Sequence, residues 1–190
     1  MPTDDYGPIL LPLARDAIAR AVGERSAARE FDAPWLREHG ATFVTLTQHN
    51  ELRGCIGTLE AHRPLRVDIE SNAVAAALHD PRFPALQREE LAYTRVEVSL
   101  LSPAEPMAAT TEADALAQLR PHVDGVILEY GYHRGTFLPQ VWEQLPDPKS
   151  FLMHLKRKAG LPYDFWAAGV KLSRYTVSKW KEPEREVKTA

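Results

Sequence analysis

The sequence of 190 residues predicts a single α+β domain. Segments with helical spacing are interspersed with pairs of strand-like segments joined by short turns, which favours antiparallel hairpins. The strand–helix–strand alternation typical of parallel sheets is missing, and we find no internal repeat or low-complexity tract. A chain of this length can bury one substantial core, with or without a small annex.

Four helices are predicted where apolar residues recur every three or four positions. Gly23 and Gly160 provide stop signals for the first and the last of them. Thr111 and Asp114 resemble a capping box at the start of the third helix. The predicted helices cover about 8–22, 64–78, 111–121 and 148–159.

Strands are predicted where β-branched and aromatic residues alternate with polar ones. A polar turn around His49 and Asn50 joins the first two strands, and Gly131 marks the turn of a second hairpin. The last strand is predicted to be continuous, and residues 181–190 to be a charged, frayed tail. The predicted strands are 41–47, 52–59, 95–100, 125–130, 133–138 and 170–180.

Composition and charge argue against several functional classes. The net charge of −3 argues against a general nucleic-acid binder, although residues 149–181 carry eight Lys and Arg against one acid. The single cysteine, Cys55, excludes an internal disulfide and a multi-cysteine zinc or iron–sulfur site. We expect no metal site, and the sequence indicates no particular cofactor. We also expect a cytoplasmic protein. A membrane span is not expected, because no apolar run approaches about 20 residues.

The candidate chemical centre is the hexapeptide LRGCIG at residues 52–57. Side chains two residues apart share a face of a strand, so Arg53 and Cys55 are predicted to point the same way. Gly54 and Gly57 would let another backbone or a ligand approach closely. A guanidinium beside a thiol favours the thiolate, or it can hold a carboxylate or phosphate. The alternative, that Cys55 is a small apolar residue in a strand, stays open.

Two neighbouring segments supply further candidates. In the loop that follows the second predicted helix, His79 could be a base and Arg82 an anion clamp. The structural alternative is that Asp80 caps backbone N–H groups. On the third predicted strand, Glu97 is a candidate base or a partner for Arg53 if its face borders a cleft.

Five motifs, in order, carry a resemblance to a known family. They lie at 51–59 (ELRGCIGTL), 80–84 (DPRFP), 96–103 (VEVSLLSP), 134–141 (RGTFLPQV) and 158–161 (KAGL). They resemble the AMMECR domain family, whose bacterial and archaeal members are called AmmeMemoRadiSam system protein A. The resemblance covers roughly residues 9–180. Carried over by position, the motif residues are Arg53, Gly54, Cys55, Gly57, Asp80, Arg82, Glu97, Gln140 and Lys158.

The resemblance implies an antiparallel sheet with flanking helices and a smaller subdomain beside a cleft. It also implies association with a Memo-like protein and a radical-SAM protein, neither of which this chain is. One departure is Lys156, which stands where many members carry a second cysteine. This departure argues against a mechanism that uses a cysteine pair.

Three functional hypotheses follow. The first is an accessory or binding protein that grips an anionic small molecule or peptide through Arg53, Arg82 and Lys158. The second is an enzyme in which Cys55 is the nucleophile, Arg53 favours its thiolate, and Glu97 or His79 handles protons. The third, a nucleic-acid-binding module, would use the basic stretch 149–181 and three aromatic residues that could stack on bases. These are Trp166, Tyr175 and Trp180.

Overall fold

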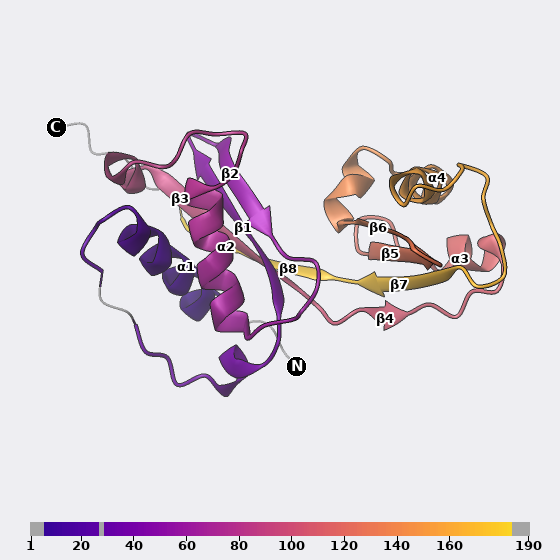
Figure 1. Ribbon diagram of the computed structural model, residues 1–190, viewed down its shortest axis with the longest axis horizontal. Coiled ribbons are helices and arrows are strands. Elements are labelled where there is room, and N and C mark those ends of the chain that lie inside the picture. The colour runs from indigo at the N-terminus through magenta and orange to yellow at the C-terminus, as the bar shows by residue number, and fades with distance from the viewer. Residues whose placement is uncertain (1–5, 27–28, 184–190) are drawn as a thin grey trace. The chain divides into compact units, whose positions relative to one another are not determined.

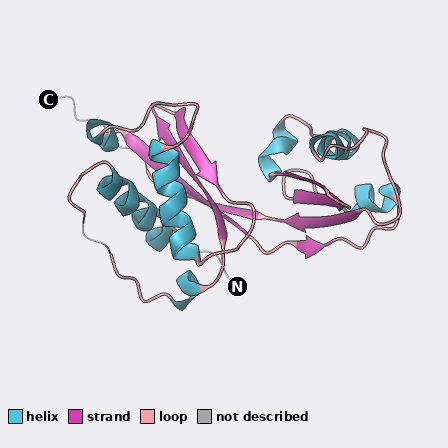
Figure 2. Ribbon diagram, viewed as in Figure 1, coloured by secondary structure: helices cyan, strands magenta, loops and turns pink. Residues whose placement is uncertain are grey.

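The computed structural model describes residues 6–26 and 29–183, which fall into two compact units (Figure 1). The first unit comprises residues 1–101 and 178–190, and the second comprises residues 102–177. Each unit contains one four-stranded sheet with antiparallel strand pairs, together with helices (Figure 2). The predicted α+β class is therefore confirmed.

In the first unit the helices α1 and α2 pack on one face of the sheet, whose strand order is β2-β1-β3-β8 (Figure 1). The buried core combines the apolar faces of both helices with inward residues of β1 and β3, such as Val44 and Val98. Strand β2 lies at the edge of the sheet, beside α2. The elements are α1 (Gly7–Ala21), η1 (Pro34–Arg37), β1 (Ala41–Gln48), β2 (Glu51–Gly57), α2 (Leu65–Leu78), η2 (Arg88–Ala92), β3 (Thr94–Leu101) and β8 (Val177–Lys181).

A two-residue turn joins β1 to β2. His49 and Asn50 have φ values of 51° and 65°, the left-handed pair of a type I′ turn, whose twist matches that of the strands. Further along the hairpin, the register shifts by one residue: Thr47 pairs with Leu52, but Leu46 pairs with Gly54. This β-bulge leaves Arg53 without an opposite residue and reverses the faces of all the β2 residues beyond it.

In the second unit the strand order is β4-β7-β5-β6, and the core includes residues of α3 and α4. The Trp142 ring stacks on the Phe151 ring at 3.7 Å, and the indole N–H donates to the carbonyl of Asp124. The elements are β4 (Glu105–Pro106), α3 (Glu112–Gln118), β5 (Gly125–Tyr130), β6 (His133–Phe137), η3 (Pro139–Glu143), α4 (Pro148–Lys158) and β7 (Lys171–Tyr175).

The four predicted helices are confirmed, and so are both hairpins. The predicted capping box of α3 is also present, with Thr111 and Asp114 each accepting a hydrogen bond from the backbone N–H of the other. Among the described residues, no helix is long and apolar enough to cross a membrane.

One strand prediction is wrong. Residues 170–180 do not form one strand but two, because β7 and β8 belong to different sheets and the chain passes from the second unit to the first after Val177, the first residue of β8. The break falls at Thr176, whose backbone N–H and carbonyl are both bonded to Ser102 instead of to a strand. Lys181 lies in β8 and Glu182 pairs with Arg15, so the ordered chain extends past the predicted start of the tail. Residues 184–190 of that tail lie outside the described residues.

Candidate functional site

The hexapeptide forms most of β2, and Gly54 lets this strand approach α2 closely. A Cβ atom built on Gly54 would lie 2.1 Å from the carbonyl oxygen of Ala76, which is helix backbone and has little freedom to move. Gly57 is equally restricted, since its Cβ would lie 2.2 Å from the ring of Phe43. Both glycines therefore accommodate other parts of the protein itself, the first of the two alternatives predicted from the sequence.

The backbone of Cys55 is held by the loop that follows α2. Its N–H donates to Asp80 Oδ2 at 2.8 Å, and its carbonyl accepts from Arg82 Nη2 at 3.2 Å. In an antiparallel pair the N–H and C=O of one residue point to the same side, so Cys55 directs both groups away from β1. Asp80 and Arg82 thus replace a neighbouring strand at this point of the sheet edge.

Asp80 and Arg82 also bind one another. The Asp80 side chain is 2% exposed and accepts from Arg82 Nε at 2.9 Å and from Nη2 at 2.7 Å. The side-chain hydrogen bond from Arg82 holds the pKa of Asp80 far below its ordinary value, more than offsetting the opposing effect of burial. The same hydrogen bond raises the pKa of Arg82. Asp80 therefore serves as a buried, ionised anchor that caps backbone N–H groups, as the structural alternative predicts.

Arg53 binds Glu90, a residue of η2 that the sequence did not suggest. The Arg53 Nε and Nη2 groups donate to the two carboxylate oxygens at 3.0 and 3.2 Å. Glu90 also accepts from Gln48 Nε2 and from the backbone N–H of Gln87. Burial raises the pKa of Glu90, but these hydrogen bonds outweigh it, and the net pKa lies below the ordinary value.

The structure thus corrects two expectations for Arg53. Its carboxylate partner is Glu90 rather than Glu97. It also does not share a face with Cys55, because the bulge lies at Arg53 and breaks the alternation. The Arg53 guanidinium and the Gln48 side-chain amide both donate to the Glu90 carboxylate. Cys55, in contrast, lies opposite Thr45 on β1.

The thiol of Cys55 is half-buried on the sheet face opposite the one that the helices cover. Its Sγ lies 3.3 Å from Thr45 Oγ1, and Thr45 in turn pairs with Glu97 on β3. The three residues therefore form one row across three strands. The Arg82 guanidinium lies beside this residue, since its Nη2 donates to the Cys55 carbonyl.

Three other predicted site residues are not part of this row. His79 is exposed at the C-terminal end of α2. Gln140 and Lys158 belong to the second unit, where Gln140 is exposed and the Lys158 ammonium donates to the Thr136 carbonyl at 2.9 Å.

Two residues of the site were missed from the sequence. Glu90 carries only the spacing of a capping box: it lies three residues after Gln87 and accepts from the Gln87 backbone N–H, but Gln87 is not the Ser, Thr, Asp or Asn that marks such a helix start in a sequence. Thr45 has no such signal in the sequence. In a regular hairpin with this turn and no bulge, Cys55 would lie opposite Val44, which is a core residue, and not opposite Thr45.

Comparison with known proteins assigns the chain to a family. The AMMECR1 family model matches residues 11–180. The chain belongs to the AMMECR1 family. Protein MJ0810 of Methanocaldococcus jannaschii is 37% identical over 186 residues, which cover 96% of this chain and 92% of the relative. A protein of Methanothermobacter thermautotrophicus is 41% identical over 163 residues, covering 84% and 85% of the two chains.

The AMMECR1 family fold is also shared with a solved structure. The crystal structure of the uncharacterized protein PH0010 from Pyrococcus horikoshii superposes with a TM-score of 0.79 at 34% identity, over 96% of this chain and 94% of that one. The family resemblance predicted from the five motifs is therefore confirmed. At Lys156 this member has a buried ammonium that binds Glu112 at 2.7 Å.

Proposed function

We propose that this AMMECR1-family protein is a non-catalytic accessory or ligand-binding component whose binding surface is centred on Cys55 and Arg82. The observation that carries the proposal is that the charged motif residues differ in their exposure to solvent. Arg53 and Asp80 are largely buried in contacts inside the first unit. Arg82 donates to Asp80 and to the Cys55 carbonyl through Nε and Nη2, but its side chain remains 54% exposed. A half-exposed guanidinium can take up a carboxylate or phosphate group.

The surroundings of the thiol favour binding over catalysis. A cysteine nucleophile is normally activated by an adjacent base that accepts its proton. The hydrogen-bond partner of the Cys55 sulfur is the neutral hydroxyl of Thr45. In residues 6–26 and 29–183, no histidine or carboxylate forms a hydrogen bond with that sulfur.

A second candidate is an enzyme that uses Cys55 as nucleophile on a small or peptide substrate. The observation in its favour is the position of the Arg82 guanidinium, which donates to the carbonyl of the half-buried Cys55 at 3.2 Å. A nearby cation favours a thiolate. In this alternative Arg82 takes over the role that the sequence suggested for Arg53.

We also propose that the protein acts in a pathway linked to radical-SAM and Memo-like proteins. This part of the proposal is supported by the family resemblance of the sequence motifs. It predicts measurable binding between the purified protein and a radical-SAM or Memo-like protein encoded in the same genome. If neither the radical-SAM protein nor the Memo-like protein binds, the pathway proposal is wrong. The proposed ligand-binding surface is tested separately.

The ligand-binding surface is tested by protection of Cys55 from iodoacetamide, a neutral reagent. Alkylation is followed by mass spectrometry with inorganic phosphate or with triglycine, which carries a peptide carboxylate, each up to about 10 mM. We expect one of these anions to slow alkylation, and Arg82→Gln to abolish the protection. Arg88→Gln, a change of an exposed arginine on η2, should keep it.

Two results would contradict the proposal. One is a lack of protection by both anions, or equal protection in the wild type and in Arg82→Gln. The other is turnover of a defined substrate by the wild type and its loss in Cys55→Ser, which would establish the cysteine enzyme instead.

A further inference from the structure

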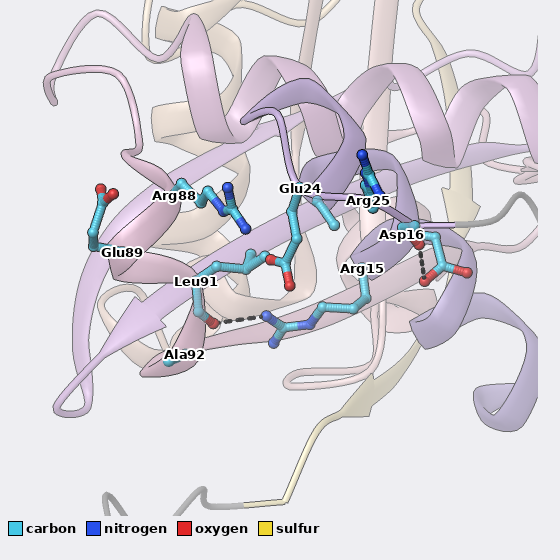
Figure 3. A pocket seen from close by; sticks show the side chains of 10 residues that line it. Arg15, Asp16, Glu24, Arg25, Arg88, Glu89, Leu91 and Ala92 are labelled. Atoms are coloured by element: carbon cyan, nitrogen blue, oxygen red, sulfur yellow. Dashed lines mark hydrogen bonds between the residues drawn. The ribbon is translucent and has the colours of Figure 1, made fainter.

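Two cavities of the first unit differ in the balance of charge around them. The cavity in Figure 3 has a volume of about 510 Å³ and is lined by equal numbers of acidic and basic residues. Those residues are Arg15, Arg25, Arg88, Asp16, Glu24 and Glu89. The second cavity, of about 690 Å³, is a groove between α1 and β8. We name it the α1–β8 groove.

The α1–β8 groove has an apolar lining. Leu11 and two prolines, Pro8 and Pro12, line it from α1, and Trp180 lines it from β8. The indole of Trp180 is fixed by close packing, since a Cβ atom on Gly7 would lie 2.6 Å from its Cδ1 atom. The groove therefore borders a close contact between α1 and β8.

Basic residues predominate around this lining. Arg15, which also lines the groove, is neutralised by its ion pair with Glu182, and Arg29 pairs with Asp16 at 3.0 Å. Lys179 and Lys181 are both exposed, and neither forms an ion pair with any residue that the structure describes. The first turn of α1 contains no acidic residue that could offset them.

We propose that the α1–β8 groove binds a small amphiphilic anion, that is, an acidic head group on an apolar or aromatic body. The apolar lining suits the body, and the two lysine ammonium groups complement the head group. The volume lies within the roughly 300–1,000 Å³ of typical small-molecule sites. The groove shares no residue with the Cys55–Arg82 surface, so this inference stands apart from the proposed function.

The test uses 8-anilinonaphthalene-1-sulfonate, an anionic aromatic dye whose fluorescence rises on binding to apolar sites. We expect saturable binding to the wild type, with a Kd about fivefold weaker in Lys179→Ala/Lys181→Ala, the effect of losing two exposed charge contacts. The matched control is Lys149→Ala/Lys171→Ala, which removes two exposed lysines from the second unit and should leave the Kd unchanged. Near-UV circular dichroism checks that every variant keeps native packing.

Competition identifies the head group. Displacement of the dye by octanoate indicates a carboxylate ligand, and displacement by phenyl phosphate indicates a phosphate ligand. The proposal is overturned if the dye does not bind, if neither anion displaces it, or if the two double variants change the Kd equally.

Discussion

The Cys55 region and the α1–β8 groove lie in the same unit, but they use their charged side chains in different ways. Around Cys55, Asp80 binds Arg82 and Glu90 binds Arg53 in contacts that hold the edge strand β2. In the groove, Lys179 and Lys181 are exposed and form no ion pair within the described chain. Signature charges such as Arg53 and Asp80 can thus be architectural, while unpaired charges outside the signature can be available to a ligand.

The largest expected effect concerns the close approach of β2 to α2. Gly54→Ala places a methyl group against the Ala76 carbonyl, and we expect a loss of about 3 kcal/mol or more in the free energy of unfolding. Gly131→Ala is the control, because nothing lies within 4 Å of its Cβ position and only its φ of +56° is unfavourable, at about 1 kcal/mol. Urea denaturation measures both. Equal losses would show that the strand is not packed against the helix backbone.

A smaller effect is expected from the ion pair that the sequence missed. Arg53→Ala leaves the largely buried Glu90 carboxylate without two of its donors, which should cost about 2–3 kcal/mol. Arg88→Ala removes an exposed arginine of the same 3-10 helix and should change the free energy of unfolding by less than about 0.5 kcal/mol. If both variants are equally stable, Arg53 is not architectural and becomes available for a ligand.

The contribution of Asp80 to the stability of the Cys55 region should depend on pH. Its pKa in the folded protein lies below its unfolded value of about 3.9, so its contribution to stability is complete above that value and is lost as the pH falls. We expect Asp80→Asn to be less stable than the wild type at pH 7, and the difference to shrink on acidification below about pH 4. Thermal unfolding at a series of pH values measures this. A difference that stays constant down to pH 2 would contradict the assigned ionised state.

The smallest effect is expected in the groove. Because Lys179 and Lys181 have no ion-pair partner among the described residues, Lys179→Ala/Lys181→Ala should alter the free energy of unfolding by less than about 0.5 kcal/mol. A loss near that of Arg53→Ala would erase the distinction between the two regions. Urea denaturation under the same conditions makes the two variants directly comparable.

Much of the fold could be predicted, because helices and hairpins carry local signals. The helix stop at Gly160 and the capping box of Thr111 are examples, and both were found in the expected places. The division of residues 170–180 into β7 and β8 could not be predicted. It depends on which sheet each half joins, and this is decided by tertiary pairing rather than by the local pattern.

The sequence singled out both segments of the candidate site but did not predict their geometry. The hexapeptide and the Asp80–Pro84 loop do meet, through the backbone of Cys55. The bulge at Arg53 has no signal in the sequence, yet it determines that Arg53 turns to Glu90 and that Cys55 leaves the core face. Because of this shift of one residue, the arginine beside Cys55 is Arg82 and not Arg53, as the sequence had suggested.

The central claim is that Asp80 and Arg82 hold the backbone of Cys55 in place of a neighbouring strand. Its most direct test is the hydrogen-exchange rate of the Cys55 amide, measured by NMR in the wild type and in Asp80→Ala, with Ile56 as the internal reference. Ile56 directs its amide toward β1, because Cys55 directs its own toward Asp80. We predict a protected Cys55 amide in the wild type, and exchange at least about tenfold faster relative to Ile56 in the variant. A Cys55 amide that already exchanges freely in the wild type, or that changes only in step with Ile56, would contradict the claim.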